Sequence, residues 1–305
     1  MVTTEHRRFA EFCDACRRYR YIGLCYGAAG VGKTLSAQHY ARWDRLQAYF
    51  HLPWPSAAAV AAVAGSTTVF YTPAVVNAPG RIAQNIQIIR HRLRALAIDV
   101  WVQEQAVQQQ ARRQAEARLR PKKLATPVVH SGNVVQISVS AATPSAEIAT
   151  AYAQQRADFP DPTDLIIIDE ADRLKTASLE QVRDIFDHGG LGVVFIGMPG
   201  IEKRLARYPQ LYSRVGFVHA FRPLSAAQVR DLLHRKWAPA GVTLPAEGIA
   251  DEDARAAIIR VTGGNFRLLH RLLTQIARLV EINALHTVTS QVVEAARESL
   301  VIGTA

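Results

Sequence analysis

Cysteine is scarce in this sequence, and its cysteines are poorly placed to bind a metal. Only three of the 305 residues are cysteine, and Cys13 and Cys16 form a lone CxxC pair. Because no second pair and no histidine cluster accompanies this pair, a zinc site is not expected. The spacing fits two neighbours on one face of a helix, and Cys25 lies in an apolar run, so all three are expected to have structural roles.

Long apolar runs are also missing. The N-terminal sequence MVTTEHRRFAEF lacks the hydrophobic region of a signal peptide, and the longest apolar run, residues 57–64, is far too short to span a bilayer. We therefore expect a cytoplasmic protein without a membrane partner. Charged residues make up 20% of the chain and apolar residues 49%, which excludes global disorder.

Positive charge, by contrast, is in excess. Lys and Arg outnumber Asp and Glu by 36 to 26, which gives a net charge of +10 and suggests a polyanionic partner such as nucleic acid. Composition alone does not separate nucleic acid from an anionic membrane surface. Residues 81–123 hold ten basic and three acidic residues, a local excess of +7. This run is either a solvated face or a phosphate-binding arm. The candidate DNA contacts are Arg81, Arg90, Arg112, Arg113, Lys122 and Lys123.

Five short runs of strand-forming residues alternate with helical segments, which predicts an α/β fold with a parallel five-stranded sheet flanked by helices. The runs are residues 21–26, 67–71, 165–168, 193–196 and 215–219. The third run, Leu-Ile-Ile-Ile, is continuously apolar and is followed by an acidic pair, as expected for a central strand. Ligands collect at the carboxyl ends of such strands.

The strand pattern ends near residue 222, and a helical pattern replaces it. Ser225 and Gln228 have the spacing of a capping box that opens a helix running to about Trp237. An apolar stripe at helical spacing over residues 266–280 predicts a second helix, and a third is expected to begin near Thr289. We therefore expect a nucleotide-binding core over residues 1–222 and a small all-helical lid over residues 223–305.

The core contains an insertion. Lys33 and Asp169, which belong to the two motifs described next, are 136 positions apart, and residues around 100–133 are basic and rich in helix formers. The stretch 101–123 has almost no apolar face. Such a helix is expected to project into solvent or to be ordered by a partner.

A phosphate-binding loop is the most specific motif in the chain. The sequence from Gly27 to Thr34 matches GxxxxGK[ST], directly after a predicted strand and before a helical run that begins near Leu35. The alternative is a glycine-rich turn that binds no ligand, but this alternative does not explain why a strand precedes the loop and a helix follows it. Lys33 would reach the β and γ phosphates of ATP, and the Thr34 hydroxyl would bind Mg²⁺. The predicted nucleotide contacts are Gly27, Ala28, Ala29, Gly30, Val31, Gly32, Lys33, Thr34 and Leu35.

Asp169 and Glu170 follow the apolar strand and have the form of a Walker B motif. Asp169 would hold Mg²⁺ and Glu170 would polarise the attacking water, although such a pair can also cap a helix. Residues 169–172 spell Asp-Glu-Ala-Asp, but a DEAD-box helicase needs a second motor lobe. The helical segment after the fifth strand does not provide one.

The order of these motifs resembles that of AAA+ ATPases. After the Walker B motif come a fourth strand ending in Ile196-Gly-Met-Pro-Gly, then Tyr-Pro-Gln-Leu-Tyr-Ser-Arg214 and Gly-Gly-Asn-Phe-Arg267. Over residues 21–296 the chain is similar to the MuB, TniB and TnsC group of transposition regulators. The resemblance implies that Arg214 is an arginine finger that acts on a neighbouring subunit, with Arg204 and Arg207 as rivals, and that Arg267 is the sensor 2 arginine.

One position departs from the family pattern. The family usually has a polar sensor 1 residue after the fourth strand, where this chain has Met198. Hydrolysis is therefore expected to be slow or to need a partner. Tyr19 and Tyr21 are candidates to contact adenine by position alone.

The resemblance implies a DNA-bound ATPase switch. ATP would promote a homo-oligomer, a ring or a helical filament, on double-stranded DNA through mainly backbone contacts. The oligomer would recruit or activate a transposase or recombinase, and hydrolysis would disassemble it. Two alternatives stay open: an initiator or loader of a helicase or clamp, and a nucleotide switch that contacts only protein.

Overall fold

The structure is a computed structural model that describes residues 3–119, 158–235, 237–239, 242–245, 248–249 and 251–300. It divides into two compact units. The first contains Met1–Asp44, Thr67–Gln87 and Thr163–Ala305, and the second contains Arg45–Ser66 and Ile88–Pro162. The sheet, the phosphate-binding loop and the C-terminal helices all belong to the first unit.

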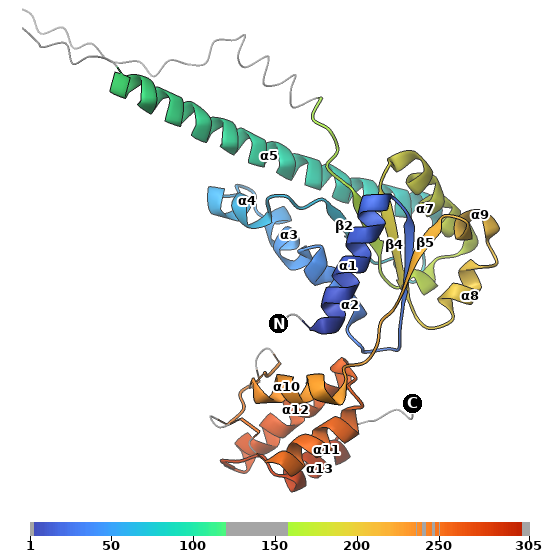
Figure 1. Ribbon diagram of the computed structural model, residues 1–305, viewed down its shortest axis with the longest axis vertical. Coiled ribbons are helices and arrows are strands. Elements are labelled where there is room, and N and C mark those ends of the chain that lie inside the picture. The colour runs from blue at the N-terminus through green and yellow to red at the C-terminus, as the bar shows by residue number, and fades with distance from the viewer. Residues whose placement is uncertain are drawn as a thin grey trace, which may run out of the picture. The chain divides into compact units, whose positions relative to one another are not determined.

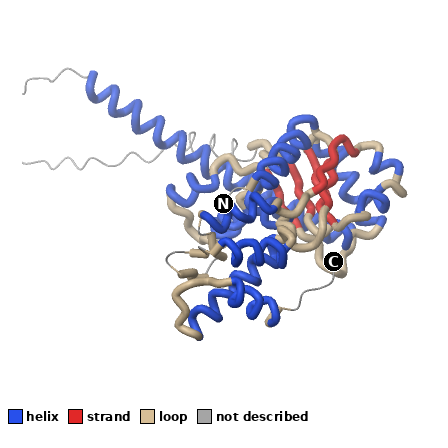
Figure 2. The backbone as a smooth tube through the Cα atoms, turned by 60° about the horizontal axis from the view of Figure 1, so that its bottom comes forward, coloured by secondary structure: helices blue, strands red, loops and turns tan. Residues whose placement is uncertain are grey.

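A five-stranded, all-parallel sheet forms the centre of the first unit (Figure 2), as predicted. The strands lie in the order β2-β3-β4-β1-β5. Their bounds are β1 Ile22–Tyr26, β2 Thr68–Tyr71, β3 Leu165–Ile168, β4 Gly192–Gly197 and β5 Val215–Ala220. Strand β3 lies between β2 and β4, and all four of its residues are buried, which explains its unbroken apolar sequence.

The strand order brings the two sequence motifs to one edge of the sheet. Strands β1 and β3 lie on either side of β4, with Tyr26 paired to Gly197 and Ile168 paired to Phe195. Because all strands are parallel, the phosphate-binding loop after β1 and the acidic pair after β3 leave the sheet at the same edge. The site is thus a direct consequence of the topology.

Helix α1, Thr4–Tyr19, explains the cysteine pair. Cys13 and Cys16 are both fully buried on this helix, together with Phe9 and Phe12, and Cys25 on β1 is buried in the same apolar cluster. Burial raises the pKa of the Cys16 thiol to about 12. The expectations that Cys13 and Cys16 lie on one face of a helix and that Cys25 lies in the core are therefore confirmed.

The remaining helices of the α/β part of this unit follow the phosphate-binding loop, β3 and β4. Glu170 is followed by a 3₁₀ turn, Ala171–Arg173, and then by α7. The α-helices are α2 Lys33–Tyr40, α7 Thr176–Gly189, α8 Ile201–Leu205 and α9 Pro209–Tyr212.

Four helices form the C-terminal part of the first unit (Figure 1): α10 Ala226–His234, α11 Glu252–Thr262, α12 Phe266–Ile282 and α13 Ser290–Glu298. The predicted capping box is confirmed, since the Gln228 N–H donates to Ser225 Oγ at 3.3 Å and the Ser225 N–H donates to Gln228 Oε1 at 2.8 Å. Helix α10 ends three residues before the predicted Trp237. Helix α11 was not predicted, because its buried face consists partly of alanine and gives a weak apolar stripe.

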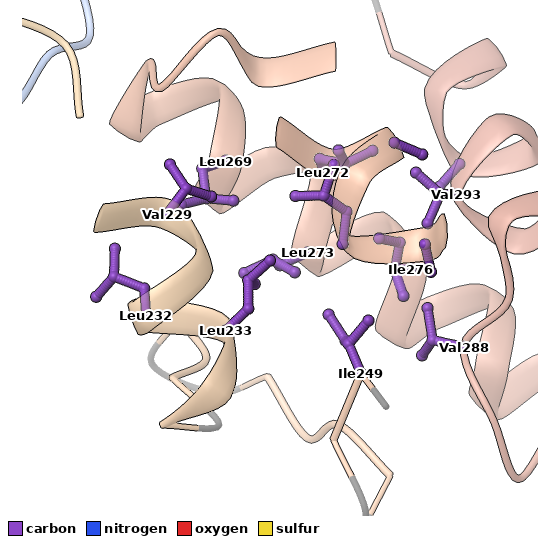
Figure 3. Close-up of a cluster of buried hydrophobic side chains, with 14 of the residues drawn as sticks. Val229, Leu232, Leu233, Ile249, Leu269, Leu272, Leu273, Ile276, Val288 and Val293 are labelled. Carbon is purple, nitrogen blue, oxygen red and sulfur yellow. The ribbon is translucent and has the colours of Figure 1, made fainter. Parts of the chain in front are cut away.

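The predicted apolar stripe on α12 forms the core of these helices. Leu269, Leu272, Leu273 and Ile276 are all fully buried at the spacing of one helix face. Figure 3 shows their side chains directed toward those of the neighbouring segments, which include Val229 from α10 and Val293 from α13. This cluster supplies the hydrophobic stabilisation of the helical part.

Gly264 joins α11 to α12 in a conformation that only glycine adopts readily. Its φ is +77°, and a Cβ at this position would lie 1.8 Å from the Leu224 carbonyl oxygen. We expect Gly264→Ala to lower the free energy of unfolding by about 2 to 4 kcal/mol, because left-handed strain and a backbone clash add together. Urea denaturation followed by circular dichroism measures this change.

The neighbouring Gly263 is a matched control. It also has a left-handed φ, +52°, but nothing lies within 4 Å of the position of its Cβ. Gly263→Ala should therefore lose only the strain contribution, about 1 kcal/mol. Equal losses in the two variants would show that the contact with Leu224 is unimportant.

The described part of the second unit is mainly helical. It contains most of α3, Trp43–Phe50, all of α4, Ala57–Val63, and the larger part of α5, Pro79–Leu119, which begins in the first unit. Helix α5 starts well before the predicted residue 101, because its first half carries a buried apolar stripe with Leu93 and Leu96. Its later part, residues 106–115, is exposed on all sides, as predicted. Within the described ranges, no helix has the length and apolar character needed to cross a membrane.

Candidate nucleotide-binding site

The phosphate-binding loop connects β1 to α2. Gly30 and Gly32 have φ angles of +79° and +107°, which explains why glycine stands at both positions. Gly32 is the N-cap of α2 and makes no side-chain capping bond. The first N–H groups of the helix, with the positive end of its dipole, are therefore available to an anionic ligand.

Lys33 is held by the loop itself. Its ammonium group donates to the carbonyl oxygens of Gly27 at 2.6 Å and Ala28 at 2.9 Å, and it lies 4.0 Å from Met198 Sδ. Burial lowers the pKa of Lys33. These contacts hold the ammonium group at the edge of the pocket described below.

Thr34 and Asp169 bring the two motifs into direct contact. The Thr34 hydroxyl donates to Asp169 Oδ2 at 2.7 Å, although the residues are 135 positions apart. Asp169 is 3% exposed, and burial raises the pKa of its carboxyl while the Thr34 hydrogen bond opposes this shift. A hydroxyl and a carboxylate are hard oxygen ligands of the kind that Mg²⁺ prefers, so this pair fits the cation.

Glu170 has an unusual backbone conformation. Its φ of 51° places a non-glycine residue in the left-handed region, at a cost of about 1 to 3 kcal/mol. Its side chain is 47% exposed and its Oε2 lies 4.0 Å from Arg173, so no residue in the described part of the chain holds it strongly. The carboxylate is available to accept a proton from a ligand or a water molecule in the pocket.

These groups border one pocket with a volume of about 260 Å³. The phosphate-binding loop, the end of β3, the end of β4 and the start of α12 all contribute to its lining. Of the predicted site residues, it brings together Ala29, Gly30, Gly32, Lys33, Thr34, Leu35, Asp169, Glu170 and Arg267.

Three further polar residues line this pocket and were not predicted. His270 and Arg271 follow Arg267 by three and four positions. Arg267, His270 and Arg271 therefore lie on one face of α12 and make that wall of the pocket basic. The spacing Arg-x-x-His-Arg in the sequence could have indicated this. Asp172, whose Oδ2 accepts the Met198 N–H at 2.7 Å, is the third.

The start of α12 is hydrogen-bonded to the phosphate-binding loop. The Arg267 N–H donates to the Gly30 carbonyl at 2.9 Å, and Asn265 Nδ2 donates to the Ala29 carbonyl at 2.8 Å. Asn265 also caps α12, since its Oδ1 accepts the Leu268 N–H at 3.1 Å. A Cβ on Gly30 would lie 2.5 Å from Asn265 Oδ1, so this contact requires glycine in the loop.

A second pocket, of about 240 Å³, adjoins the first and shares Gly32, Leu35 and Phe266 with it. Its lining includes apolar side chains and a buried carboxylate: Val31, Phe221, Leu224 and Glu5. The tyrosines considered as adenine contacts do not line either pocket. Tyr19 and Tyr21 are instead largely exposed beside Phe217.

Arg214 does not line the pocket. Its Nε lies 2.5 Å from Asp187 Oδ1 and its Nη2 lies 2.9 Å from Asp187 Oδ2, and its third nitrogen donates to the Gln210 carbonyl. Arg183 contacts the same carboxylate at 2.7 Å. The Arg214 guanidinium is the main reason why the pKa of Asp187 is lowered.

The two rival arginines lie in different environments. Arg204 donates to the carbonyl oxygens of Asp172 and Leu174, so it stabilises the turn that follows the Walker B motif. Arg207 is exposed at the surface.

The candidate DNA contacts differ in exposure. Arg81 is exposed near the start of α5, and Arg112 and Arg113 are exposed on its polar half. Arg90 is only 20% exposed and forms an ion pair with Asp161 at 2.8 Å, so its charge is already partly compensated. Lys122 and Lys123 lie outside the described residues.

Comparison with known proteins agrees with this geometry. Residues 16–205 match the family model of an AAA domain, and the chain belongs to this family of P-loop ATPases. The chain is also 38% identical over 304 residues to a "Potential ATP-binding protein" from Staphylococcus aureus, which covers 99% of this chain and 96% of that protein.

Solved structures support the fold. The RuvB Holliday junction branch migration motor of Thermotoga maritima is 14% identical, with a TM-score of 0.51 over 99% of this chain and 71% of that chain. A single-site mutant of the same motor gives 13% identity, a TM-score of 0.52 and the same coverage. At these identities the likeness concerns the fold alone.

Proposed function

We propose that this chain is an ATP-driven switch that assembles on double-stranded DNA. In this proposal the ATP-bound homo-oligomer, a ring or a filament, recruits or activates a transposase or recombinase, and hydrolysis disassembles it. The observation that carries the proposal is the hydrogen bond between Thr34 and Asp169, which joins the two motifs of an ATPase beside one pocket.

The two adjoining pockets fit the two parts of ATP. The first holds the triphosphate, because it offers Lys33, the N-terminus of α2 and the basic face of α12. The second, in which the apolar side chains of Val31, Phe221 and Leu224 lie among polar ones, holds the nucleoside. Thr34 and Asp169 would hold Mg²⁺, which neutralises the charge that develops on the phosphate oxygens when it is bound.

The residues of the chain have distinct tasks in hydrolysis. Lys33 leaves the loop carbonyls to contact the β and γ phosphates, and Glu170 accepts the proton of the attacking water. Arg267 contacts the phosphates from α12. Because the start of α12 is hydrogen-bonded to Ala29 and Gly30, a change in the bound phosphates is transmitted to the C-terminal helices.

The positive charge supports the DNA part of the proposal. The chain carries a net charge of +10, and Arg112 and Arg113 are exposed on the polar half of α5. We expect these side chains to contact mainly phosphates, so binding should depend little on base sequence and should weaken steeply with salt.

Lys33→Ala tests the central claim. Because Lys33 contacts the phosphates, we expect the variant to lose ATP-dependent oligomers on duplex DNA, while the wild-type chain forms them with ATP or a slowly hydrolysed analogue but not with ADP. Gel shift and electron microscopy at low salt measure both properties together. Lys203→Ala, which removes an exposed lysine on α8, is the matched control.

The absence of DNA binding in every nucleotide state would overturn the proposal. It would favour a second candidate, an AAA+ initiator or loader that acts on a protein partner. One observation supports that candidate: Val75 and Val76 are 75% and 88% exposed on the loop after β2. Asn77 anchors this loop, because its side-chain amide donates to the carbonyl oxygen of Arg173 at 3.0 Å. Arg173 is close in sequence to the Walker B motif.

A further inference from the structure

Glu5 is a buried carboxylate with no role in the phosphate chemistry described above. It lies in the first turn of α1, is 5% exposed, and borders the second pocket. A carboxylate is rarely buried without strong partners, because removal of its charge from water is costly. Its position beside a cavity therefore calls for an explanation.

Among the residues that the structure describes, the polar contacts of Glu5 are long. Its Oε1 accepts the Arg222 N–H at 3.3 Å and lies 3.5 Å from His219 Nε2, and its Oε2 lies 3.7 Å from Arg8 Nη1. Hydrogen bonds to oxygen are normally 2.7 to 3.2 Å long. An ionised carboxylate offers about four acceptor positions, so Glu5 retains the capacity to accept a hydrogen bond from a ligand.

His219 does little to neutralise this charge. Its ring packs among those of Phe9, Phe12 and Phe221, with centroid distances of 5.5 to 6.1 Å. Burial lowers the pKa of His219, so the imidazole is neutral at pH 7. Glu5 thus places a carboxylate acceptor in the wall of the pocket, and Arg8, at 3.7 Å, partly balances its charge.

We infer that Glu5 selects adenine as the base of the bound nucleotide by accepting a hydrogen bond from the amino group at the six-position. This rests on the proposed function, in which the second pocket holds the nucleoside. The apolar side chains of Val31, Phe221 and Leu224 contact the faces of a purine. Adenine carries an amino donor at its six-position, whereas guanine and hypoxanthine carry a carbonyl oxygen there, which a carboxylate repels. A site built to bond an N–H group discriminates strongly against analogues that lack it.

Competition binding with a fluorescent ATP analogue tests this inference. ATP, GTP and ITP compete against the analogue on the full chain and on Glu5→Gln, whose neutral amide can both accept and donate. We expect the wild type to bind ATP at least about tenfold more tightly than GTP or ITP, and Glu5→Gln to bring the ratio close to one. Glu11→Gln, which alters an exposed carboxylate on the same helix, should keep the wild-type ratio.

A measurement on the wild type alone covers the case in which Glu5→Gln does not fold. N6,N6-dimethyl-ATP has no N–H at the six-position, and it should bind about tenfold more weakly than ATP. Equal binding of ATP, GTP and ITP by the wild type, or an unchanged ratio in a folded Glu5→Gln, would overturn the role of Glu5 alone. If no triphosphate binds to the wild type, the proposed nucleotide site falls with it.

Discussion

Glu170→Gln is expected to lower the rate of ATP hydrolysis by about 10² to 10⁴-fold, the usual contribution of a general base. The amide keeps the size of the side chain but cannot accept the proton of the attacking water. ATP binding should stay close to that of the wild type, because Lys33, Thr34 and Asp169 make the contacts with the nucleotide in the proposed mechanism. Phosphate release at saturating ATP gives kcat, and titration with a fluorescent ATP analogue gives Kd.

The geometry of Glu170 makes this substitution a clean test. The side chain is 47% exposed and its closest charged partner, Arg173, lies at 4.0 Å, so little folding energy depends on its charge. Glu281→Gln, which replaces an exposed carboxylate on α12, is the control and should hydrolyse ATP at the wild-type rate. An unchanged kcat in Glu170→Gln would remove the residue from the catalytic step and would direct attention to Asp172, the other acidic side chain of that turn that borders the pocket.

Much of the core could be predicted because its signals are local. The run Leu-Ile-Ile-Ile predicts a buried strand wherever the chain places it, and β3 has the predicted bounds. The loop from Gly27 to Thr34 is likewise determined by its own glycines. The family and the parallel sheet could therefore be predicted from the sequence, whereas the assignment to the transposition regulators stays a proposal.

Helix α5 shows how a signal can be present and still be missed. Its apolar residues Ile82, Ile86, Leu93 and Leu96 are spaced at helical intervals and are buried, and Pro79 stands at its start, where proline is favoured. The polar stretch after residue 101 has the stronger compositional bias, so a helix was predicted there and not over residues 79–100. In the structure the two stretches form one helix of 41 residues, with a buried first part and an exposed second part.

Other features depend on contacts between distant residues, which no local pattern contains. Glu5 meets Arg222 across 217 positions, and Asn265 meets Ala29 across 236. The second pocket exists only because α1, α2 and the start of α12 converge on it. The pairing of Arg214 with Asp187 belongs to the same group, and it bears directly on how that arginine works.

Arg214→Ala is expected to lower ATP hydrolysis by the assembled protein by about 10³ to 10⁵-fold, the contribution of arginine fingers in other phosphoryl-transfer enzymes. The reason is the loss of a positive charge that a neighbouring subunit presents to the γ-phosphate. Nucleotide binding by the isolated chain should change little, because Arg214 does not line its own pocket. Arg207→Ala, which removes the exposed rival, should keep the wild-type rate. A reversed result would move the role to Arg207.

The bond between Arg214 and Asp187 adds a condition to this prediction. In the single chain both nitrogens that face Asp187 are engaged, so the guanidinium must leave this carboxylate, or share it, before it reaches a neighbour.

A mixing experiment separates an action between subunits from a structural role within one. Lys33→Ala chains have a defective pocket but an intact Arg214, and Arg214→Ala chains have the reverse. If the arginine acts between subunits, a mixture of the two inactive variants regains hydrolysis, because some interfaces combine the intact pocket of one chain with the intact arginine of the other. A mixture that stays inactive would mean that Arg214, bonded to Asp187, serves the stability of its own chain.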